Sequence, residues 1–553
     1  MNESLSSEDA AGRPGVRQCA LVAALLLLVM AGLTWPQFSD YASLVANHWD
    51  PLLSVWRLGW IAHALATDPR HLFDAPIFFP EARTLAYTDA VLLPALVSAP
   101  FIWLGVPLVI VYNTMLLGSM LLSGIGAWLL ARRLTGHTLA ALAAALAFGF
   151  APYRFDHYEH LELQASFALP WTLLALEHVR ARGRWRDAIA VAAAFTAQVL
   201  CSIYYAVFLA TLLPIYVLIR FGPRALLTTQ RAAMLRTLAA LACAGVLLVP
   251  YLTIYSRNHA VVGERPVGHV ELYSATPGDF VRPHPGQLIL GRQLGDDSIS
   301  ERRLFPGVTV TLLALIALWA APNRRTFALA VLVAGAALIA LGTNGPLFPW
   351  LRDHVLPYRG LRVPARAAMI GQLALAVMAA LALARLLPRA RLRAAALAGL
   401  VCAAIVLESL HVPLDLMRPS AEPVELSTWL ATQPKAVVLE LPLPTPTALY
   451  VADGEYMFSA AVTSRWNPTL NGYSGFYPRS FDELMEVMLT FPDEPSMAYL
   501  RRRKVDFIVV HQSLYQAPEY GPLLGNLLAR PEVTPVARFG RAGREVMVFG
   551  LRR

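Results

Sequence analysis

Long runs of apolar residues recur along most of this chain, and they decide its class of fold. A helix needs about 20 apolar residues to cross ~30 Å of hydrocarbon. Hydrophobic residues make up 56% of the chain and charged residues 15%, whereas an ordinary soluble protein has ~25% charged residues. This composition excludes a soluble enzyme, a disordered protein and a coiled coil. The four cysteines all lie in apolar segments without paired spacing, so a disulfide scaffold or a cysteine zinc site is also excluded.

Arginine marks the loops that we expect on the cytoplasmic side of the membrane. The net charge is +9, but every basic residue except Lys435 and Lys504 is an arginine lying mostly between apolar runs, so the charge is not a nucleic-acid-binding stripe. The first run, 19–35, follows Arg13 and Arg17 and precedes no small-residue cleavage site, which indicates a retained anchor with a cytoplasmic N-terminus. The remaining cytoplasmic loops are predicted at 132–133, 180–186, 220–236, 324–325 and 385–393.

The runs between these loops predict about 11 or 12 crossings. The run 90–106 carries several prolines and is interpreted as a re-entrant or juxtamembrane helix. We therefore predict an all-α polytopic membrane protein with a C-terminal α/β domain. Its parts are a cytoplasmic N-terminus (1–18), a membrane domain (19–410) and an extracytoplasmic domain (411–553). The loops expected outside the cytoplasm are 36–90, 152–161, 202–205, 256–305 and 342–364.

The C-terminal part has the composition of a water-exposed domain, because charge density rises after Pro413 and the apolar blocks end. Segments 436–441 and 507–511 are predicted as buried strands, and 536–539 with 545–549 as a hairpin. Helical spacing is found at 427–431, 481–489 and 496–503.

The first outward loop is rich in aspartate and tryptophan. Trp49, Trp56 and Trp60 would share one face of a helix lying in the headgroup layer. Asp50 precedes Pro51 and has two equally weighted interpretations: a helix N-cap, or a general base whose pKa is raised beside an apolar wall. Asp40 is a second candidate for the base.

A second cluster, PYRFDHYEHLELQ at 152–164, concentrates acidic and histidine residues. Such groups can bind a divalent cation, or a diphosphate through one, although the spacing fits no closed metal motif. A solvated connection between helices is the favoured alternative. Glu162 and Gln164 are expected to enter the next membrane helix and face a cavity. The candidate substrate-binding residues of this cluster are Arg154, His157, Glu159 and His160.

A third cluster, YRGLRVPARA at 358–367, places Arg359, Arg362 and Arg366 in an outward loop near a helix N-terminus. The planar fork of arginine and the free amides of a helix start both favour phosphate. The alternative is binding of lipid headgroups. The charged residues of loop 256–305 are given no specific role.

These features together resemble the GT-C superfamily of polytopic glycosyltransferases, closest to its YfhO-like and protein-mannosyltransferase-like bacterial branches. The resemblance rests on a single first helix, a large first loop with an early Asp, the acidic stretch HYEHLELQ after AALAFGFAPY, and a soluble C-terminal domain. It implies an inverting hexosyltransferase with a polyprenyl-phosphate sugar donor, an acceptor that is a glycan, lipid or protein, and Asp50 or Asp40 as base. The second element reads His157-Tyr158-Glu159 and not Asp-x-Asp, which leaves a divalent metal (Mg or Mn) open.

Two other classes of function remain as alternatives. One is a transporter or flippase of lipid-linked saccharides, and the other is a non-catalytic envelope assembly protein. Transporters need polar groups near the middle of several spans, whereas the polar clusters here gather at one face. That pattern favours the transferase. The excess of arginine over lysine indicates a GC-rich bacterium and hence its inner membrane. The stretch NPTLNGYSGFYP (467–478) resembles a recurrent sequence of such membrane proteins but suggests no role.

Overall fold

The computed structural model describes residues 14–295, 299–419, 424–433, 436–443, 451–541 and 543–552. Most of the predicted N-terminal segment 1–18 therefore lies outside the described residues. The chain divides into two compact units. We name them the helical unit, with Met1–Ser39, Thr114–Tyr251 and Glu264–Asp415, and the mixed unit, with Asp40–Asn113, Leu252–Gly263 and Leu416–Arg553.

The chain is a multi-pass membrane protein. In the described residues, 7 helical stretches are long and apolar enough to cross a membrane. They are α2 (Val16–Leu33), α6 (Leu108–Thr135), α7 (Thr138–Gly149) continued by α8 (Pro152–Asp156), α12 (Ile203–Phe221), Arg231–His259 of α14 (Arg231–Val262), α20 (Ala368–Leu386) with its preceding turn from Pro364, and α21 (Arg391–Ser409).

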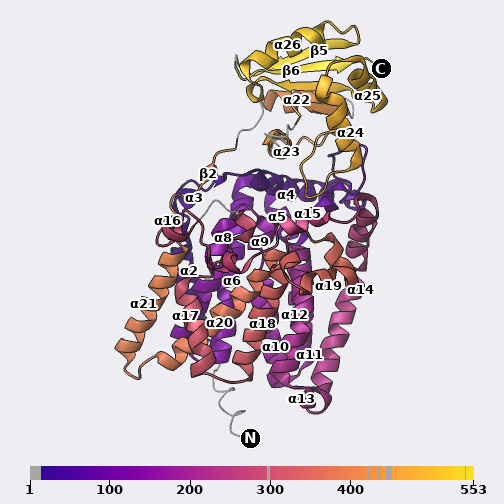
Figure 1. The fold of residues 1–553 in the computed structure, drawn as a ribbon. Coiled ribbons are helices and arrows are strands. Elements are labelled where there is room, and N and C mark those ends of the chain that lie inside the picture. The colour runs from indigo at the N-terminus through magenta and orange to yellow at the C-terminus, as the bar shows by residue number, and fades with distance from the viewer. Residues whose placement is uncertain are drawn as a thin grey trace. The chain divides into compact units, whose positions relative to one another are not determined.

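The other predicted crossings are helices too, but shorter ones. They are α10 (Ala168–Arg182), α11 (Trp185–Cys201), α17 (Val308–Ala320) and α18 (Arg324–Ala340), with 15, 17, 13 and 17 residues. A helix of 17 residues is about 26 Å long. Figure 1 shows these helices alongside the longer ones. The run 90–106 forms α5 (Leu92–Trp103), whose 12 residues span about 18 Å and fall short of a crossing.

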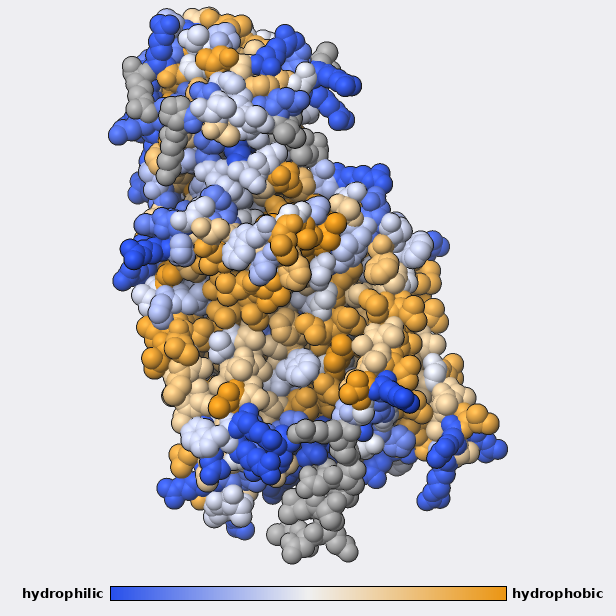
Figure 2. Space-filling view, turned by 180° about the vertical axis from the view of Figure 1, so that it is seen from behind, coloured by the Kyte–Doolittle hydropathy of each residue, from blue (hydrophilic) through white to orange (hydrophobic). Residues whose placement is uncertain are grey.

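The arginine-rich loops lie together at one end of the helical unit. The Arg236 guanidinium donates to the Gly183 carbonyl over 2.6 Å, Gln230 donates to the Arg180 carbonyl over 3.1 Å, and Arg325 donates to the Leu134 carbonyl. In Figure 1 this end is marked by α13 (Pro223–Leu227). Figure 2 shows a band of hydrophobic side chains over the helices and hydrophilic side chains gathered at this end.

Three of the predicted outward loops, 202–205, 256–305 and 342–364, meet at the opposite end of the helical unit. The Arg265 amide donates to the Arg359 carbonyl over 3.2 Å, and the Arg362 amide donates to the Tyr204 hydroxyl over 2.9 Å. Figure 1 shows α8, α9 (Leu161–Gln164), α15 (Val267–Leu272) and α16 (Gly291–Leu294) at this end, away from α13. The helical unit also contains α3 (Trp35–Ser39) and α19 (Leu347–His354).

The C-terminal part of the mixed unit is an α/β domain around a sheet of 4 strands in the order β3-β4-β6-β5. These strands are β3 (Val438–Leu441), β4 (Phe507–His511), β5 (Val533–Phe539) and β6 (Val546–Leu551). β3 and β4 are parallel, and the other pairs are antiparallel. The two predicted strands and the predicted hairpin are thus confirmed, because alternating and buried β-branched residues specify them.

Helices cover both faces of this sheet. α22 (Val424–Thr432) packs Leu426 and Leu430 against Val438, Val509 and Val548. α26 (Ala517–Leu528) lies on the other side (Figure 1). The three predicted helical segments correspond to α22, α24 (Arg479–Val487) and α25 (Glu494–Arg502).

The first outward loop packs with the C-terminal part in the same unit. β1 (Val45–Ala46) pairs with β2 (Leu416–Met417), and α4 (Trp49–Thr67) packs on α23 (Val451–Val462). The face of α4 that we predicted to meet lipid headgroups meets Trp466 instead. The Trp466 ring centroid lies 6.5 Å from that of Trp56, which is 2% exposed, and 5.5 Å from that of Trp60. The headgroup prediction is wrong for this face because a distant segment supplies its aromatic partner.

Candidate functional site

Polar groups gather in both units. The predicted base candidates Asp40 and Asp50 belong to the mixed unit. The other predicted site residues belong to the helical unit, and they are Arg154, His157, Glu159, His160, Arg359, Arg362 and Arg366. We first describe the helical unit.

A chain reversal after α7 builds the first part of its cluster. α8 starts with Pro152 at its first turn, where a proline costs no hydrogen bond. The buried Arg154 guanidinium donates to the Phe148 carbonyl over 2.7 Å, to Gln164, and to the Ser166 hydroxyl over 2.8 Å. Arg154 therefore holds the reversal, and we do not carry it into the substrate site.

Gln164 has a structural place in the same reversal. Its side-chain amide donates to the Arg154 and His157 carbonyls over 2.8 Å each. Glu162 and Gln164 lie in the short helix α9, and the membrane helix α10 begins only at Ala168. The expectation that both enter the next membrane helix is wrong. Residues 165–167 are not helical and separate α9 from α10. Glu162 and Gln164 therefore lie before the membrane helix and not within it.

His157, Glu159 and His160 point their ligand atoms toward one another. One ligand atom from each of the three lies within 4.8 Å of the other two, and His160 Nδ1 is 2.9 Å from Glu159 Oε1. His157 is fully buried, and neither ring nitrogen makes a hydrogen bond within the described part of the chain. Burial lowers the pKa of His157 to about 4, so its imidazole is neutral at physiological pH. A neutral imidazole, with the lone pair of one ring nitrogen available, is the form that binds a metal ion.

Glu301 and Arg366 form a buried ion pair beside this triad. The Arg366 guanidinium donates through Nε to both Glu301 oxygens over 3.1 and 3.2 Å. Burial alone would raise the pKa of Glu301, but Arg366 and His157 outweigh it and lower this pKa to about 2. His157 Nε2 lies 3.6 Å from the same carboxylate. No role was assigned to Glu301 from the sequence. The only signal in the sequence is that Glu301 lies in the predicted loop 256–305 among several arginines, with which a carboxylate can form an ion pair.

The predicted arginines of the third cluster have different environments. Arg366 is committed to Glu301, and its guanidinium carbon also lies 5.0 Å from the Tyr204 ring centroid. Arg359 is half-exposed, with Glu264 3.3 Å away. The Arg362 guanidinium carbon lies 5.7 Å from the Tyr273 ring centroid. Of the three, Arg362 is the one whose guanidinium is not paired with a carboxylate among the described residues.

Arg265 adds a basic residue that the sequence reasoning did not assign. It is 8% exposed. Burial lowers its pKa to about 10, and the positive charges of Arg362 and Arg366 act in the same direction. Three arginines close enough to repel one another form a site that an anion would stabilise.

In the mixed unit, the two candidate bases have opposite surroundings. Asp40 lies 2.6 Å from the guanidinium of Arg418, and their side chains are 31% and 71% exposed. The hydrogen bond from Arg418, followed by one from Ser43, lowers the pKa of Asp40. Asp50 is 15% exposed and accepts a hydrogen bond of 2.8 Å from the Tyr473 hydroxyl on Oδ1.

The predicted N-cap role of Asp50 is wrong. The N-cap of α4 is His48, which has extended backbone and accepts the Asp50 amide hydrogen on Nδ1 over 3.2 Å. The helix begins at Trp49, so Asp50 is its second residue and Pro51 its third. His48 Nδ1 is also 3.1 Å from Asp50 Oδ2, and a nitrogen that accepts the Asp50 amide hydrogen cannot donate to that oxygen at the same time. The Asp50 carboxylate thus contacts Tyr473 and His48, and the side chain that caps α4 is that of His48.

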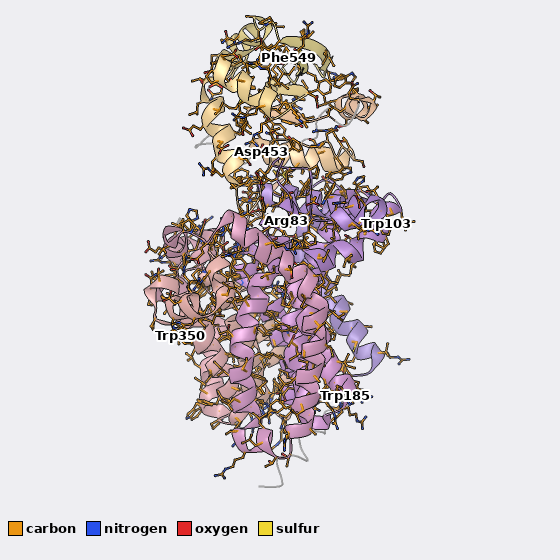
Figure 3. All side chains as sticks on the ribbon, turned by 90° about the vertical axis from the view of Figure 1, so that its right-hand side faces the viewer. Arg83, Trp103, Trp185, Trp350, Asp453 and Phe549 are labelled. Atoms are coloured by element: carbon orange, nitrogen blue, oxygen red, sulfur yellow. The ribbon has the colours of Figure 1, made fainter. Side chains whose placement is uncertain are left out.

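A second polar network lies inside the C-terminal domain. Glu440 is held by Arg465 and by His511 Nε2, each over 2.6 Å, and their combined effect overrides burial and lowers the pKa of Glu440 to about 2. Asp453, labelled in Figure 3, accepts from Asn471 over 2.9 Å, while its Oδ2 makes no hydrogen bond within the described residues. Burial raises the pKa of Asp453 to about 7.

The fold defines a polytopic membrane protein. The chain superposes on the cryo-EM structure of arabinofuranosyltransferase AftD from Mycobacteria with a TM-score of 0.64, at 16% identity over 98% of this chain and 40% of that one. A mutant form of AftD gives a TM-score of 0.66 at 15% identity, covering 98% and 42%. This chain therefore spans less than half of AftD, and the likeness shows the fold.

The chain belongs to the family described as Domain of unknown function (DUF6311), which matches residues 20–406. A weaker likeness is to the archaeal oligosaccharyltransferase AglB from Archaeoglobus fulgidus, with a TM-score of 0.45 at 13% identity over 96% of this chain and 74% of that one. No curated protein matches the sequence.

Proposed function

We propose that this protein is a glycosyltransferase that moves a sugar from a polyprenyl-phosphate donor to a glycan, lipid or protein acceptor at the outward end of the helical unit. The observation that carries the proposal is the gathering of His157, Glu301, Arg265 and Arg362 at one end of a GT-C fold. AftD, which has the same fold, is an arabinofuranosyltransferase. A transporter would need such groups at mid-membrane.

The reaction is a single displacement. An acceptor hydroxyl oxygen forms a bond to the anomeric carbon, the bond from that carbon to the donor phosphate oxygen breaks, and the phosphate keeps the electron pair. Asp50 takes the hydroxyl proton. Arg362 and Arg265 bind the phosphate, whose negative charge grows as the bond breaks. One displacement inverts the anomeric carbon.

Asp50 is the better base of the two candidates. Asp40 forms an ion pair with Arg418, which stabilises its charged form and weakens it as a proton acceptor. The Asp50 side chain has the neutral Tyr473 hydroxyl on Oδ1 and His48 beside Oδ2. It is also less exposed than Asp40, with 15% against 31% of the side chain exposed.

His157, Glu159 and His160 fit a divalent metal ion. Two imidazole nitrogens and one carboxylate oxygen are donors that suit zinc better than magnesium. A bound ion would supply positive charge to a phosphate or diphosphate. Glu301 stands beside His157 and would orient its ring.

The direct test uses synthetic undecaprenyl-phosphoryl arabinofuranose, mannose and glucose with the purified full chain and a bacterial envelope extract. Release of free undecaprenyl phosphate reports cleavage of the donor whatever the acceptor is. We expect one of the three donors to be consumed, and consumption to stop when Arg362 is replaced by Ala. Binding of all three without release, combined with their movement across vesicle membranes, would establish a transporter instead.

We also propose that the arginine-rich end faces the cytoplasm of a bacterial inner membrane, because positive loops stay on that side. The C-terminal domain would then be extracytoplasmic. Alkaline phosphatase fused after residue 553 is expected to be active and green fluorescent protein at the same place to be dark. The reverse pair of results would overturn the proposed side of the reaction.

A further inference from the structure

The segment 467–478 joins two parts of the mixed unit that lie far apart in sequence. On one side, the Val438 amide of β3 donates to the Pro468 carbonyl over 2.8 Å. On the other side, the amides of Phe78 and Phe79 in the first loop donate to the carbonyls of Asn471 and Thr469 over 2.9 Å each. The segment is therefore a connection between the C-terminal sheet and the first outward loop.

Asn471 fixes this segment from within the C-terminal domain. Its side chain accepts from the Glu440 amide over 2.7 Å and donates to the Glu440 carbonyl over 3.0 Å. It also donates to Asp453 over 2.9 Å. The next residue is Gly472, where a Cβ atom would approach the Phe78 ring to 2.7 Å. A side chain there would push the segment off the first loop.

Tyr473 follows directly and carries the connection to the candidate base. Its ring is 9% exposed, and its amide donates to Met457 Sδ over 3.3 Å. Its hydroxyl donates to Asp50 Oδ1 over 2.8 Å. Asp50 comes from α4 of the first loop, so a residue 423 positions away supplies this hydrogen bond.

We propose that Tyr473 is a positioning residue for the Asp50 carboxylate, and that the C-terminal domain thereby completes the catalytic apparatus. This inference rests on the proposed role of Asp50. The hydrogen bond from the Tyr473 hydroxyl to Oδ1 restricts the rotation of the Asp50 carboxylate and so fixes the direction in which it meets the acceptor hydroxyl. A hydrogen bond to a charged group of this kind is worth about tenfold or more in an equilibrium or rate.

The test is a double-mutant cycle in the full chain with the donor identified by the turnover assay above. Tyr473→Phe removes only the hydroxyl, and we expect kcat to fall about tenfold or more with the donor KM unchanged. Tyr499→Phe is the matched control, because its hydroxyl donates to the Ser480 carbonyl over 3.0 Å, away from Asp50. In the Asp50→Asn background, Tyr473→Phe should cost no further activity, since the residue acts through Asp50.

A second readout does not depend on turnover. The melting temperatures of Asp50→Asn, Tyr473→Phe and the double variant should be non-additive, because Asp50→Asn removes the charge from the hydrogen bond that Tyr473→Phe removes altogether. Wild-type kcat for Tyr473→Phe beside an inactive Asp50→Asn would overturn the inference and leave the base in place. Wild-type kcat for Asp50→Asn would remove the base itself, and an equal loss from Tyr473→Phe in both backgrounds would show a role that does not pass through Asp50.

Discussion

The polar cluster of the helical unit and that of the mixed unit treat their carboxylates differently. In the helical unit, Glu301 is neutralised by Arg366, and the imidazole of His157 stays buried and uncharged beside it. In the mixed unit, Glu440 is paired with Arg465 in the same way, whereas Asp50 and Asp453 accept hydrogen bonds from the neutral donors Tyr473 and Asn471. Glu301 is therefore held as a fixed charge, whereas Asp50 and Asp453 are the carboxylates whose named donors are neutral.

The difference follows from what each cluster has beside its carboxylates. An arginine paired with a buried carboxylate locks both charges, and the site then has a fixed electrostatic character. A hydroxyl or amide donor stabilises the charged form of a carboxylate less than a full positive charge does, and burial raises the pKa of Asp453 to about 7. The division matches a transferase that binds a phosphate and removes a proton, and the predictions below test each half.

The largest expected effect is at the proton-accepting cluster. Asp50→Asn keeps the shape of the side chain but cannot take a proton, so turnover of the undecaprenyl-phosphate donor should fall by about 10²–10⁴-fold. Asp40→Asn loses an exposed ion pair and should retain most of the activity. Both are measured as release of undecaprenyl phosphate under the same conditions.

The two variants together decide the assignment. An inactive Asp40→Asn beside a normal Asp50→Asn would transfer the base to Asp40 and with it the need for Arg418 to move. Full activity of both variants would remove the first loop from the chemistry, and the comparison of the two clusters would then fail.

The next effect concerns the group held by the helical unit. We expect the purified protein to bind zinc, and His157→Ala or His160→Ala to weaken zinc binding by about 100-fold or more. His269→Ala, on an exposed turn of α15, is the control and should bind zinc normally. Metal content after dialysis and titration with a zinc chelator measure this without turnover. Equal zinc content in all four proteins would show that the triad holds no metal.

A smaller effect is expected at the phosphate. Arg362→Lys keeps the charge but loses the planar fork, so the donor KM should rise about tenfold with a smaller change in kcat. Arg282→Lys is the matched control, because its guanidinium lies 3.0 Å from Asp279 and is thus already paired with a carboxylate. Unchanged donor KM in Arg362→Lys would favour the lipid-headgroup interpretation of this arginine.

Hydropathy and arginine placement predicted the membrane part well. Each predicted crossing outside 90–106 is a helix, and the basic loops meet at one end through bonds such as Arg236 to Gly183. Both signals are local, because span length and loop charge are read from short windows of sequence. The strands 436–441 and 507–511 were predictable for the same reason.

Partners that come from distant segments were not predictable. Nothing near Asp50 indicates Tyr473, and nothing near Arg366 indicates Glu301, because each contact depends on how separate elements pack. The same limit explains the error at α4: its tryptophans satisfy the pattern of an interfacial helix, and only the fold shows that Trp466 covers them. The spacing of the tryptophans thus predicted the apolar face of α4 correctly, but it could not predict which segment packs on that face.

The smallest effect is a pH dependence of stability in the mixed unit. Asp453 has a pKa of about 7 in the folded protein, raised by burial from 3.8. Between these values the folded state keeps a proton that the unfolded state has lost. The free energy of unfolding therefore falls as the pH rises from 3.8 toward 7 and levels off above it. Asp453→Asn resembles the protonated acid and removes this dependence. Its melting temperature should therefore fall less than that of the wild type between pH 5 and pH 8, by roughly 3 °C.

Asp353→Asn changes an exposed aspartate of the helical unit and is the control, so its melting temperature should follow the wild-type curve. A parallel curve for Asp453→Asn would mean that Asp453 is already ionised in the folded protein, and the contrast between a charge-holding and a proton-accepting cluster would then rest on Asp50 alone.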